Sequence, residues 1–414
     1  MRCCRTLRRE LPNRRQGFEV RLQRPAATAL RRGFRCVETA PCHQGAPTVA
    51  KGLVLVCGRL WRASVQMTIR VTASQAEDRS VAPEAREGIL TIAGDLPLHF
   101  GGTLRDVKVA WRLTGARIGD APIVAALGGI SASRVVFSEA NAGQQGWWNG
   151  VVGPGCPVDS SRFAVLGFDF LGGSGGSTGP KAGDSRFPSI SAFDQAEILH
   201  RLIAHLGAKR LHAIVGASYG GMVALAFAER YPDEVGHIVS ISAADHTHPM
   251  ATAWRSVQRA IVRHAASRGE GAEGLKLARA LAMATYRSPA EFAARFGGPP
   301  TKTDSGFRFP VESYLFARGD AYAQRYIPEA FVCLSESIDL HFVEPAKIRV
   351  PTTLIGVLED QLVPIADMRS LRDRVAARCR LTELSSVYGH DAFLKEVEAM
   401  RPVLAEALSG GPEP

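Results

Sequence analysis

One short segment, residues 211–222, restricts the possible folds of this chain more than any other. An apolar run, Leu211-His-Ala-Ile-Val, leads directly into Gly216-Ala-Ser218-Tyr-Gly220, and a helix-forming stretch follows. When a Gly-x-Ser-x-Gly turn joins a strand to a helix, the serine backbone is strained and its neighbours must lack side chains. The turn lifts the serine hydroxyl clear of the sheet. The pattern therefore predicts a nucleophilic Ser218; the alternative is a glycine-rich turn with an incidental serine.

Strands and helices alternate along most of the remaining chain. Strands are expected at residues 122–127, 163–170, 211–215, 235–242, 350–357 and 380–384, most of them as apolar runs typical of buried parallel strands. Helices are expected at residues 190–206, 222–231, 368–379 and 393–408, and a β-hairpin is expected at residues 89–116. This order predicts an α/β fold with a mostly parallel sheet and helices on both faces.

A helix-rich insertion interrupts the alternation at residues 245–345. Its clearest helical segments are residues 275–286 and 289–296, and a proline suits the first turn of the second. We expect this insertion to form a helical lid. The core would then consist of residues 67–244 and 346–408, followed by a loose tail at 409–414.

The first 66 residues differ from the body of the chain in charge. They hold 14 Lys and Arg against 3 Asp and Glu, a net charge of +11, so the rest of the chain carries −1 of the total of +10. Five of the eight cysteines also lie there, without a zinc-binding spacing. We interpret residues 1–66 as a basic extension that is disordered, or as sequence upstream of a true start at Met67. A transit peptide and a nucleic-acid-binding arm are the alternatives.

The body of the chain gives no sign of a nucleic-acid or membrane partner. It is almost neutral and poor in cysteine, as expected in a reducing compartment, so a cytoplasmic location is predicted. No run of 18 or more uncharged apolar residues occurs, which argues against a membrane-spanning helix.

A nucleophilic serine needs a histidine base and a carboxylate that orients it. In α/β-hydrolase folds these follow the serine in the order acid, then histidine. Asp360 comes just past an expected strand, in Leu-Glu-Asp-Gln-Leu-Val-Pro, and His390 lies in a loop before the last helix. Glu359 competes with Asp360, but the acid followed by x-x-Val-Pro fits better. The predicted triad is Ser218, Asp360 and His390.

The remaining parts of such a site are two oxyanion donors. The backbone amide of Tyr219 follows the nucleophile, and a second amide should come from the loop after the first parallel strand, where we favour Leu127. The glycine-rich run at residues 172–179 lacks the Gly-Lys-Ser/Thr ending of a phosphate loop and is interpreted as a close-packed loop. Trp147-Trp148 is either a substrate wall or core.

Several segments resemble the homoserine O-acyltransferases of the MetX type. They are Gly146-Trp-Trp, Val152-Gly-Pro-Gly155, the run from Leu171 to Pro180, Gly216-Ala-Ser-Tyr-Gly-Gly-Met222, Ala284-Thr-Tyr-Arg287-Ser with Phe292 and Arg295-Phe, Val311-Glu-Ser-Tyr-Leu, and Gly389-His-Asp-Ala-Phe. The resemblance implies an α/β-hydrolase fold, acyl transfer from acyl-CoA as co-substrate, no other cofactor or metal, and a homodimer. It places the triad on Ser218, Asp360 and His390. Its homoserine-binding pattern falls on Arg287, for the carboxylate, and Asp391, for the ammonium.

The sequence also departs from the commoner members of that family. The loop after Pro180 is short, Tyr219 stands where Met is frequent, and residues 329–341 follow a different pattern. The chain resembles a branch that transfers succinyl rather than acetyl groups, so L-homoserine and succinyl-CoA are the expected substrates. Acetyl-CoA as donor, serine as acceptor, and a plain esterase or thioesterase remain alternatives. A succinyl group needs a cation near its end, and Arg255 and Arg259 are the candidates; the alternative is that both are surface residues of a helix.

Overall fold

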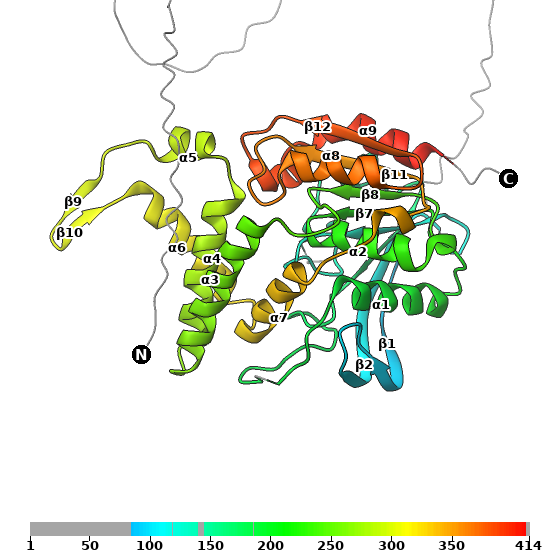
Figure 1. Cartoon of the computed structure of the whole chain (residues 1–414), viewed down its shortest axis with the longest axis horizontal. Helices are drawn as coiled ribbons and strands as arrows, with labels where there is room; N and C mark the ends of the chain where they lie inside the picture. The colour runs from blue at the N-terminus through cyan, green and yellow to red at the C-terminus, as the bar shows by residue number, and fades with distance from the viewer. Residues whose placement is uncertain (1–83, 118, 140–144, 185, 411–414) are drawn as a thin grey trace, which may run out of the picture. The chain divides into compact units, whose positions relative to one another are not determined.

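In the computed structural model (Figure 1), residues 84–117, 119–139, 145–184 and 186–410 are described. The predicted extension at 1–66, its boundary at Met67, and most of the predicted tail lie outside these residues. Eight strands form one sheet in the order β1-β2-β6-β3-β7-β8-β11-β12. Their bounds are β1 (Glu84–Pro97), β2 (Thr103–Gly115), β3 (Ile123–Leu127), β6 (Ala164–Phe168), β7 (Ala213–Ala217), β8 (Ile238–Ile241), β11 (Thr352–Val357) and β12 (Cys379–Leu384).

The sheet is mostly parallel, as predicted. Strand β1 pairs antiparallel with β2, and β2 pairs antiparallel with β6, while every pairing from β6 to β12 is parallel. All residues of β6, β7, β8 and β11 are buried, which explains why these strands read as continuous apolar runs.

Helices cover both faces of the sheet (Figure 1). Alternate residues of a strand point to opposite faces, so Ile214 of β7 packs in one apolar cluster and Val215 in another. The first cluster includes side chains from α1 (Ala192–His205), α2 (Tyr219–Arg230) and α8 (Ile365–Arg374); the second includes Met400 and Leu404 of α9 (Val397–Ser409). None of the described helices is long and apolar enough to cross a bilayer.

The segment between β8 and β11 is mainly helical. It contains α3 (Pro249–Ala266), α4 (Gly271–Tyr286), α5 (Pro289–Phe296), α6 (Pro310–Ala323) and α7 (Pro328–Asp339). Helix α4 packs between α3 and α6, and a hairpin of β9 (Thr301–Thr303) and β10 (Gly306–Arg308) extends from this group (Figure 1). The hairpin was not predicted, because its strands are only three residues long and mostly exposed.

Two boundaries differ from the prediction near the predicted catalytic residues. Helix α2 begins at Tyr219, three residues earlier than expected, because Ser218 is its N-cap. The last helix begins at Val397, later than expected, because Gly389–Leu394 form a separate 3-10 helix, η3, that carries His390. The remaining short elements are β4 (Val152–Gly153), β5 (Val158–Asp159), η1 (Pro232–Glu234) and η2 (Pro345–Lys347).

Candidate active site

Ser218 lies in a strained turn between β7 and α2. Its φ of 54° and ψ of −121° fall outside the regions that side-chain-bearing residues favour, a conformation that costs about 1–3 kcal/mol. A hydrogen bond from its amide to the carbonyl of Ile241 at 2.8 Å ties the turn to the neighbouring strand β8. The surrounding sheet therefore stabilises the strained backbone of Ser218. This backbone conformation places the hydroxyl at the carboxyl end of the sheet.

The two glycines of the turn are required by the close approach of backbone atoms. A methyl group on Gly216 would lie 2.1 Å from the carbonyl oxygen of Gly220, and one on Gly220 would lie 2.3 Å from the carbonyl oxygen of Leu127. Neither neighbour is a movable side chain. Helix α2 can pack this closely on β7 and β3 only because both positions lack Cβ atoms.

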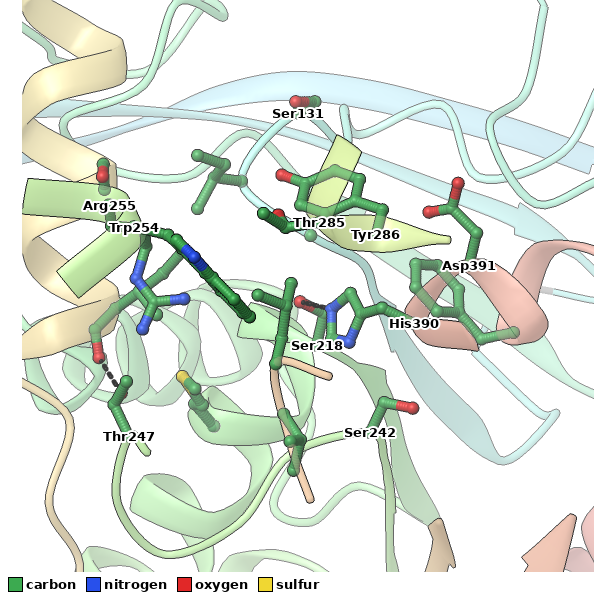
Figure 2. Close-up of a pocket in the computed structure, with 18 of the residues that line it drawn as sticks. Ser131, Ser218, Ser242, Thr247, Trp254, Arg255, Thr285, Tyr286, His390 and Asp391 are labelled. Carbon is green, nitrogen blue, oxygen red and sulfur yellow. Dashed lines mark hydrogen bonds between the residues drawn. The ribbon is translucent and has the colours of Figure 1, made fainter. Parts of the chain in front are cut away.

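The three side chains predicted as a triad form one connected hydrogen-bonded array. The Nε2 of His390 lies 2.8 Å from Ser218 Oγ, and its Nδ1 lies 2.7 Å from Asp360 Oδ2. Because a carboxylate can only accept, Nδ1 carries the proton and Nε2 is free to accept the proton of the serine hydroxyl. Figure 2 shows the imidazole of His390 directed at Ser218.

Asp360 is held rigidly in its role as acceptor. Its second oxygen, Oδ1, accepts from the amides of Leu362 and Val363 at 2.8 and 3.0 Å, and the residue is buried. The competing acid, Glu359, instead accepts from Ser385 and Ser386. Burial acts to raise the pKa of Glu359, but these two hydrogen bonds lower it overall. The side chains of Glu359 and Asp360 thus have different hydrogen-bond partners, and of the two only Asp360 contacts His390.

His390 is buried, and its environment acts on its pKa in opposite directions. Burial lowers the pKa because it disfavours the imidazolium, whereas the charge of Asp360 and the hydrogen bond to it raise the pKa. The net effect raises the pKa of His390 above its usual value of 6.5. A more basic imidazole is better suited to take a proton from a serine hydroxyl.

The oxyanion donors remain a prediction. As the first residue of α2, Tyr219 has a backbone N–H without an acceptor in its own helix, at the positive end of the helix dipole. Leu127 ends β3 and lies beside the turn, as the close approach of its carbonyl to Gly220 indicates. The Tyr219 side chain is fully buried, and its hydroxyl pairs with Ser337 of α7 at 2.6 Å.

Ser218 and His390 open into a cavity lined by both the core and the helical insertion. The core contributes Asp391 and Asp367, while the insertion contributes Trp254, Arg255, Arg279, Thr285, Tyr286 and Phe331. Of the two adjacent tryptophans, Trp147 lines the cavity, whereas Trp148 is buried and donates its Nε1–H to the carbonyl of Phe393. Figure 2 shows Asp391 beyond His390 on the side of the cavity away from Arg255.

Arg287 and Asp391, the two predicted homoserine ligands, form an ion pair with each other. Arg287 Nε donates to Asp391 Oδ2 at 2.8 Å, and its Nη1 donates to Glu291 at 2.9 Å. Asp391 lines the cavity, but Arg287 does not. Two carboxylates hold the Arg287 guanidinium behind Asp391, and the homoserine-binding role of Arg287 and Asp391 stays a prediction.

A different arginine, Arg279, lines the cavity and is not among the residues predicted from the sequence. Its guanidinium lies over the rings of Tyr286 and Tyr322, at 5.1 and 4.7 Å from their centroids, and no carboxylate among the described residues pairs with it. Burial acts to lower the pKa of Arg279, but the two tyrosines and Asp391 raise it overall. A signal was present: Leu275, Ala278 and Ala282 form the buried stripe of α4, and Arg279 is a charged residue on that stripe.

Other sequence features have structural roles. In the glycine-rich loop, Gly175 and Gly176 pack against Asp169, which accepts from the Gly176 amide and from Arg134, each at 2.7 Å. Within the described residues no group of three or more His, Cys, Asp or Glu could hold a metal ion.

Comparison with known proteins agrees with this geometry. A family model described as the alpha/beta hydrolase fold matches residues 126–397. The chain is 39% identical over 362 residues to a homoserine O-succinyltransferase of Xanthomonas campestris pv. campestris, covering 87% of this chain and 92% of the relative. The chain belongs to the homoserine O-acyltransferase family. The predicted α/β-hydrolase fold and the predicted family are thereby confirmed.

More distant relatives differ in the reaction that their names state. A serine O-succinyltransferase of Litchfieldella anticariensis is 32% identical, covering 79% of this chain and 99% of the relative. A homoserine O-acetyltransferase of Mycobacterium bovis is also 32% identical, covering 82% and 97%. The crystal structure of homoserine O-acetyltransferase from Bacillus anthracis superposes with a TM-score of 0.71 at 18% identity, covering 79% of this chain and 98% of that one. This last likeness shows the common fold.

Proposed function

We propose that the protein transfers a succinyl group from succinyl-CoA to the side-chain hydroxyl of L-homoserine, a step in methionine biosynthesis. The observation that carries the proposal is the array of Ser218, His390 and Asp360 opening into a cavity that also holds a guanidinium and a carboxylate. The acyl donor is supported by the 39% identity to a homoserine O-succinyltransferase.

The first half-reaction forms an acyl-serine. Ser218 Oγ attacks the thioester carbonyl carbon while His390 Nε2 takes the hydroxyl proton, and Asp360 stabilises the resulting imidazolium. The negative charge that develops on the carbonyl oxygen is stabilised by the amides of Tyr219 and Leu127, at about 3 kcal/mol per donor. The carbon–sulfur bond then breaks, and His390 returns the proton to the sulfur, so CoA leaves as a thiol.

The second half-reaction hands the acyl group to the acceptor. His390 Nε2, again unprotonated, takes the proton of the homoserine hydroxyl, whose oxygen attacks the ester carbon of the acyl-serine. The serine oxygen is the leaving group and receives the proton from His390, which restores the free enzyme. Because water competes with homoserine, the enclosed cavity favours transfer over hydrolysis.

Homoserine carries a carboxylate and an ammonium on one carbon, so the protein groups that bind them must be neighbours. Asp391 is suited to the ammonium. For the carboxylate we propose Arg279 instead of Arg287, because Arg279 lines the cavity and lies close enough to Asp391 to sense its charge. Arg287 then acts as a positioning residue that holds the Asp391 carboxylate in place.

Two other reactions have specific support. The name of the M. bovis relative supports acetyl transfer to homoserine, and the name of the L. anticariensis relative supports succinyl transfer to serine. Serine is shorter than homoserine by one methylene, a difference worth only about 1–3 kcal/mol in a pocket. An esterase or thioesterase would share the triad but would not need the charged acceptor site.

The test is to incubate the purified protein with homoserine and either succinyl-CoA or acetyl-CoA. Free thiol is measured continuously and the product is identified by mass. We expect O-succinylhomoserine from the wild type and none from Ser218→Ala, whereas Ser305→Ala, in the exposed turn between β9 and β10, behaves like the wild type. Thiol release that does not respond to homoserine, with succinate as the sole product, would instead indicate a thioesterase.

The remaining features follow from the same proposal. The reaction needs no metal or cofactor besides the acyl-CoA. We propose that the protein is cytoplasmic, because Cys156, Cys333 and Cys379 are free thiols. We also propose that it is a homodimer, because the family that it resembles forms homodimers. Light scattering of the purified protein measures the oligomeric state.

A further inference from the structure

The side chain of Tyr219 joins the helix that follows the nucleophile to the helical insertion. Tyr219 is the first residue of α2, and its hydroxyl oxygen lies 2.6 Å from Ser337 Oγ on α7. Both residues are fully buried. Burial raises the pKa of the Tyr219 hydroxyl, so the hydroxyl stays protonated and can donate a hydrogen bond. The proposed acyl transfer uses the backbone amide of Tyr219 and gives this side chain no role.

Helix α7 lies between the core and the rest of the insertion (Figure 1). Its residue Leu334 packs in the apolar cluster of the core that contains Tyr219, whereas Phe331 packs with α3 and α4 in a separate cluster. Arg259 of α3 donates to the carbonyl of Ser335 on α7 at 3.0 Å. A shift of α7 relative to α2 would therefore also shift the other helices of the insertion relative to the nucleophile.

Three residues of α7 form part of the wall of the catalytic cavity: Phe331, Ser335 and Ile338. An acyl-serine in this cavity can react with two nucleophiles, the hydroxyl of the acceptor and water. A displaced α7 would open the wall to water and would weaken the contacts of the acceptor. Both changes would favour hydrolysis over transfer, because transfer depends on the exclusion of water.

The hydrogen bond between Tyr219 and Ser337 differs from other hydrogen bonds of α7 in its burial. For comparison, Ser189 donates to Glu336 of α7 at 3.0 Å, and both of these residues are only partly buried, so water can replace either partner. Water does not reach Tyr219 or Ser337. The loss of either hydroxyl therefore leaves a buried polar group without its partner, which is costly.

We propose that the hydrogen bond between Tyr219 and Ser337 holds α7 in place beside the nucleophile and thereby protects the acyl-serine from water. Both side chains are positioning residues, because neither lines the cavity in which the reacting atoms meet. This inference rests on the proposed acyl transfer and adds the contact that favours transfer over hydrolysis.

The test measures the ratio of O-succinylhomoserine to succinate formed from succinyl-CoA at one subsaturating concentration of homoserine. We expect Ser337→Ala to lower this ratio by about three- to tenfold, as the loss of one hydrogen bond predicts. The initial burst of thiol, which precedes the reaction with the acceptor, should keep its wild-type rate. Tyr219→Phe should lower the ratio by the same factor, and the double variant should lower it no further, since both changes remove the same contact.

Tyr231→Phe is the matched control. Tyr231 lies at the opposite end of α2, and its hydroxyl donates to Glu197 of α1. This variant also removes one tyrosine hydrogen bond of α2, but it leaves α7 untouched, so it should keep the wild-type ratio. Denaturant titration of all the variants separates a change in the ratio from a general loss of stability.

The outcomes separate this inference from the proposed function. If the wild type forms no acylhomoserine, the proposed function fails. If the wild type forms it and Ser337→Ala keeps the ratio, or if Tyr231→Phe lowers the ratio equally, only the role of the hydrogen bond is overturned. A slower burst with an unchanged ratio also overturns it, because the pair would then act on the first half-reaction. Should Ser337→Ala or Tyr219→Phe not fold, the other variant decides.

Discussion

Replacing Arg279 by methionine tests the acceptor site that the structure, and not the sequence, indicates. Methionine keeps an unbranched apolar stem between Tyr286 and Tyr322 but removes the guanidinium that lines the cavity. A planar guanidinium can give a carboxylate two parallel charge-assisted hydrogen bonds. At about 1.5–3 kcal/mol each, and allowing for their non-additivity, the loss is about 3–4 kcal/mol. We expect kcat/KM for homoserine to fall on the order of 10²- to 10³-fold.

The assay separates the two half-reactions of Arg279→Met. The acceptor is absent from the first, so the initial burst of thiol from succinyl-CoA should match the wild type. In the second, the acyl-serine should partition toward hydrolysis, giving succinate at the expense of O-succinylhomoserine. Mass analysis of both products measures this partition.

A truncated acceptor provides the control for this variant. 3-Amino-1-propanol has the hydroxyl and the amine of homoserine but no carboxylate, so it cannot use Arg279. Wild type and Arg279→Met should acylate it equally well, since a pairwise contact absent from both reactions cannot differ between them. If the variant slowed transfer to both acceptors by the same factor, the Arg279 guanidinium would not be binding the carboxylate of homoserine, and the reasoning would be refuted.

Two further predictions concern the turn and the triad. Because the pKa of His390 is raised by Asp360 and the imidazole must be unprotonated to act as base, kcat/KM should fall as the pH drops through an acid limb lying above 6.5. Asp360→Asn should lower the rate by about 10⁴-fold and move that limb to lower pH; a pH–rate profile with an unmoved limb would contradict this. Gly220→Ala places a methyl group 2.3 Å from the carbonyl oxygen of Leu127, so the free energy of unfolding from denaturant titration should fall by at least about 1–3 kcal/mol. Gly298→Ala, which meets nothing within 4 Å, should change it little, and equal stability of the two variants would rule out the steric argument.

The parts of this protein that were predictable depend on neighbours in the chain. The apolar runs of β7 and β11 identify strands that are buried on both faces, and Gly216 and Gly220 mark a turn in which a Cβ would collide with backbone. The placing of Asp360 and His390 after a strand and before the last helix follows from the order of elements. Their hydrogen-bonded meeting with Ser218 is in the structure, while their catalytic roles stay proposals until the variants are measured.

The hairpin of β9 and β10 was not predictable, because three-residue strands carry too little periodicity. The same holds for the 3-10 helix that carries His390, since two turns of 3-10 helix resemble the start of an α-helix in sequence. In both cases the packing of the surrounding segments decides the conformation.

The sequence alone determined the nucleophile turn, the parallel sheet and the family, because each is recorded in residues that are close together or in matched order along the chain. Tertiary structure alone decided which side chains of the protein each arginine contacts. Arg287, Arg279 and Arg255 have the same side chain, and each lies on or next to a helix of the insertion, so the sequence does not distinguish their roles. Folding brings Asp391 and Glu291 to the first, tyrosine rings to the second and Asp339 to the third. Burying a charge is costly unless it is paired, and the groups that pair with each of these arginines come from distant parts of the chain.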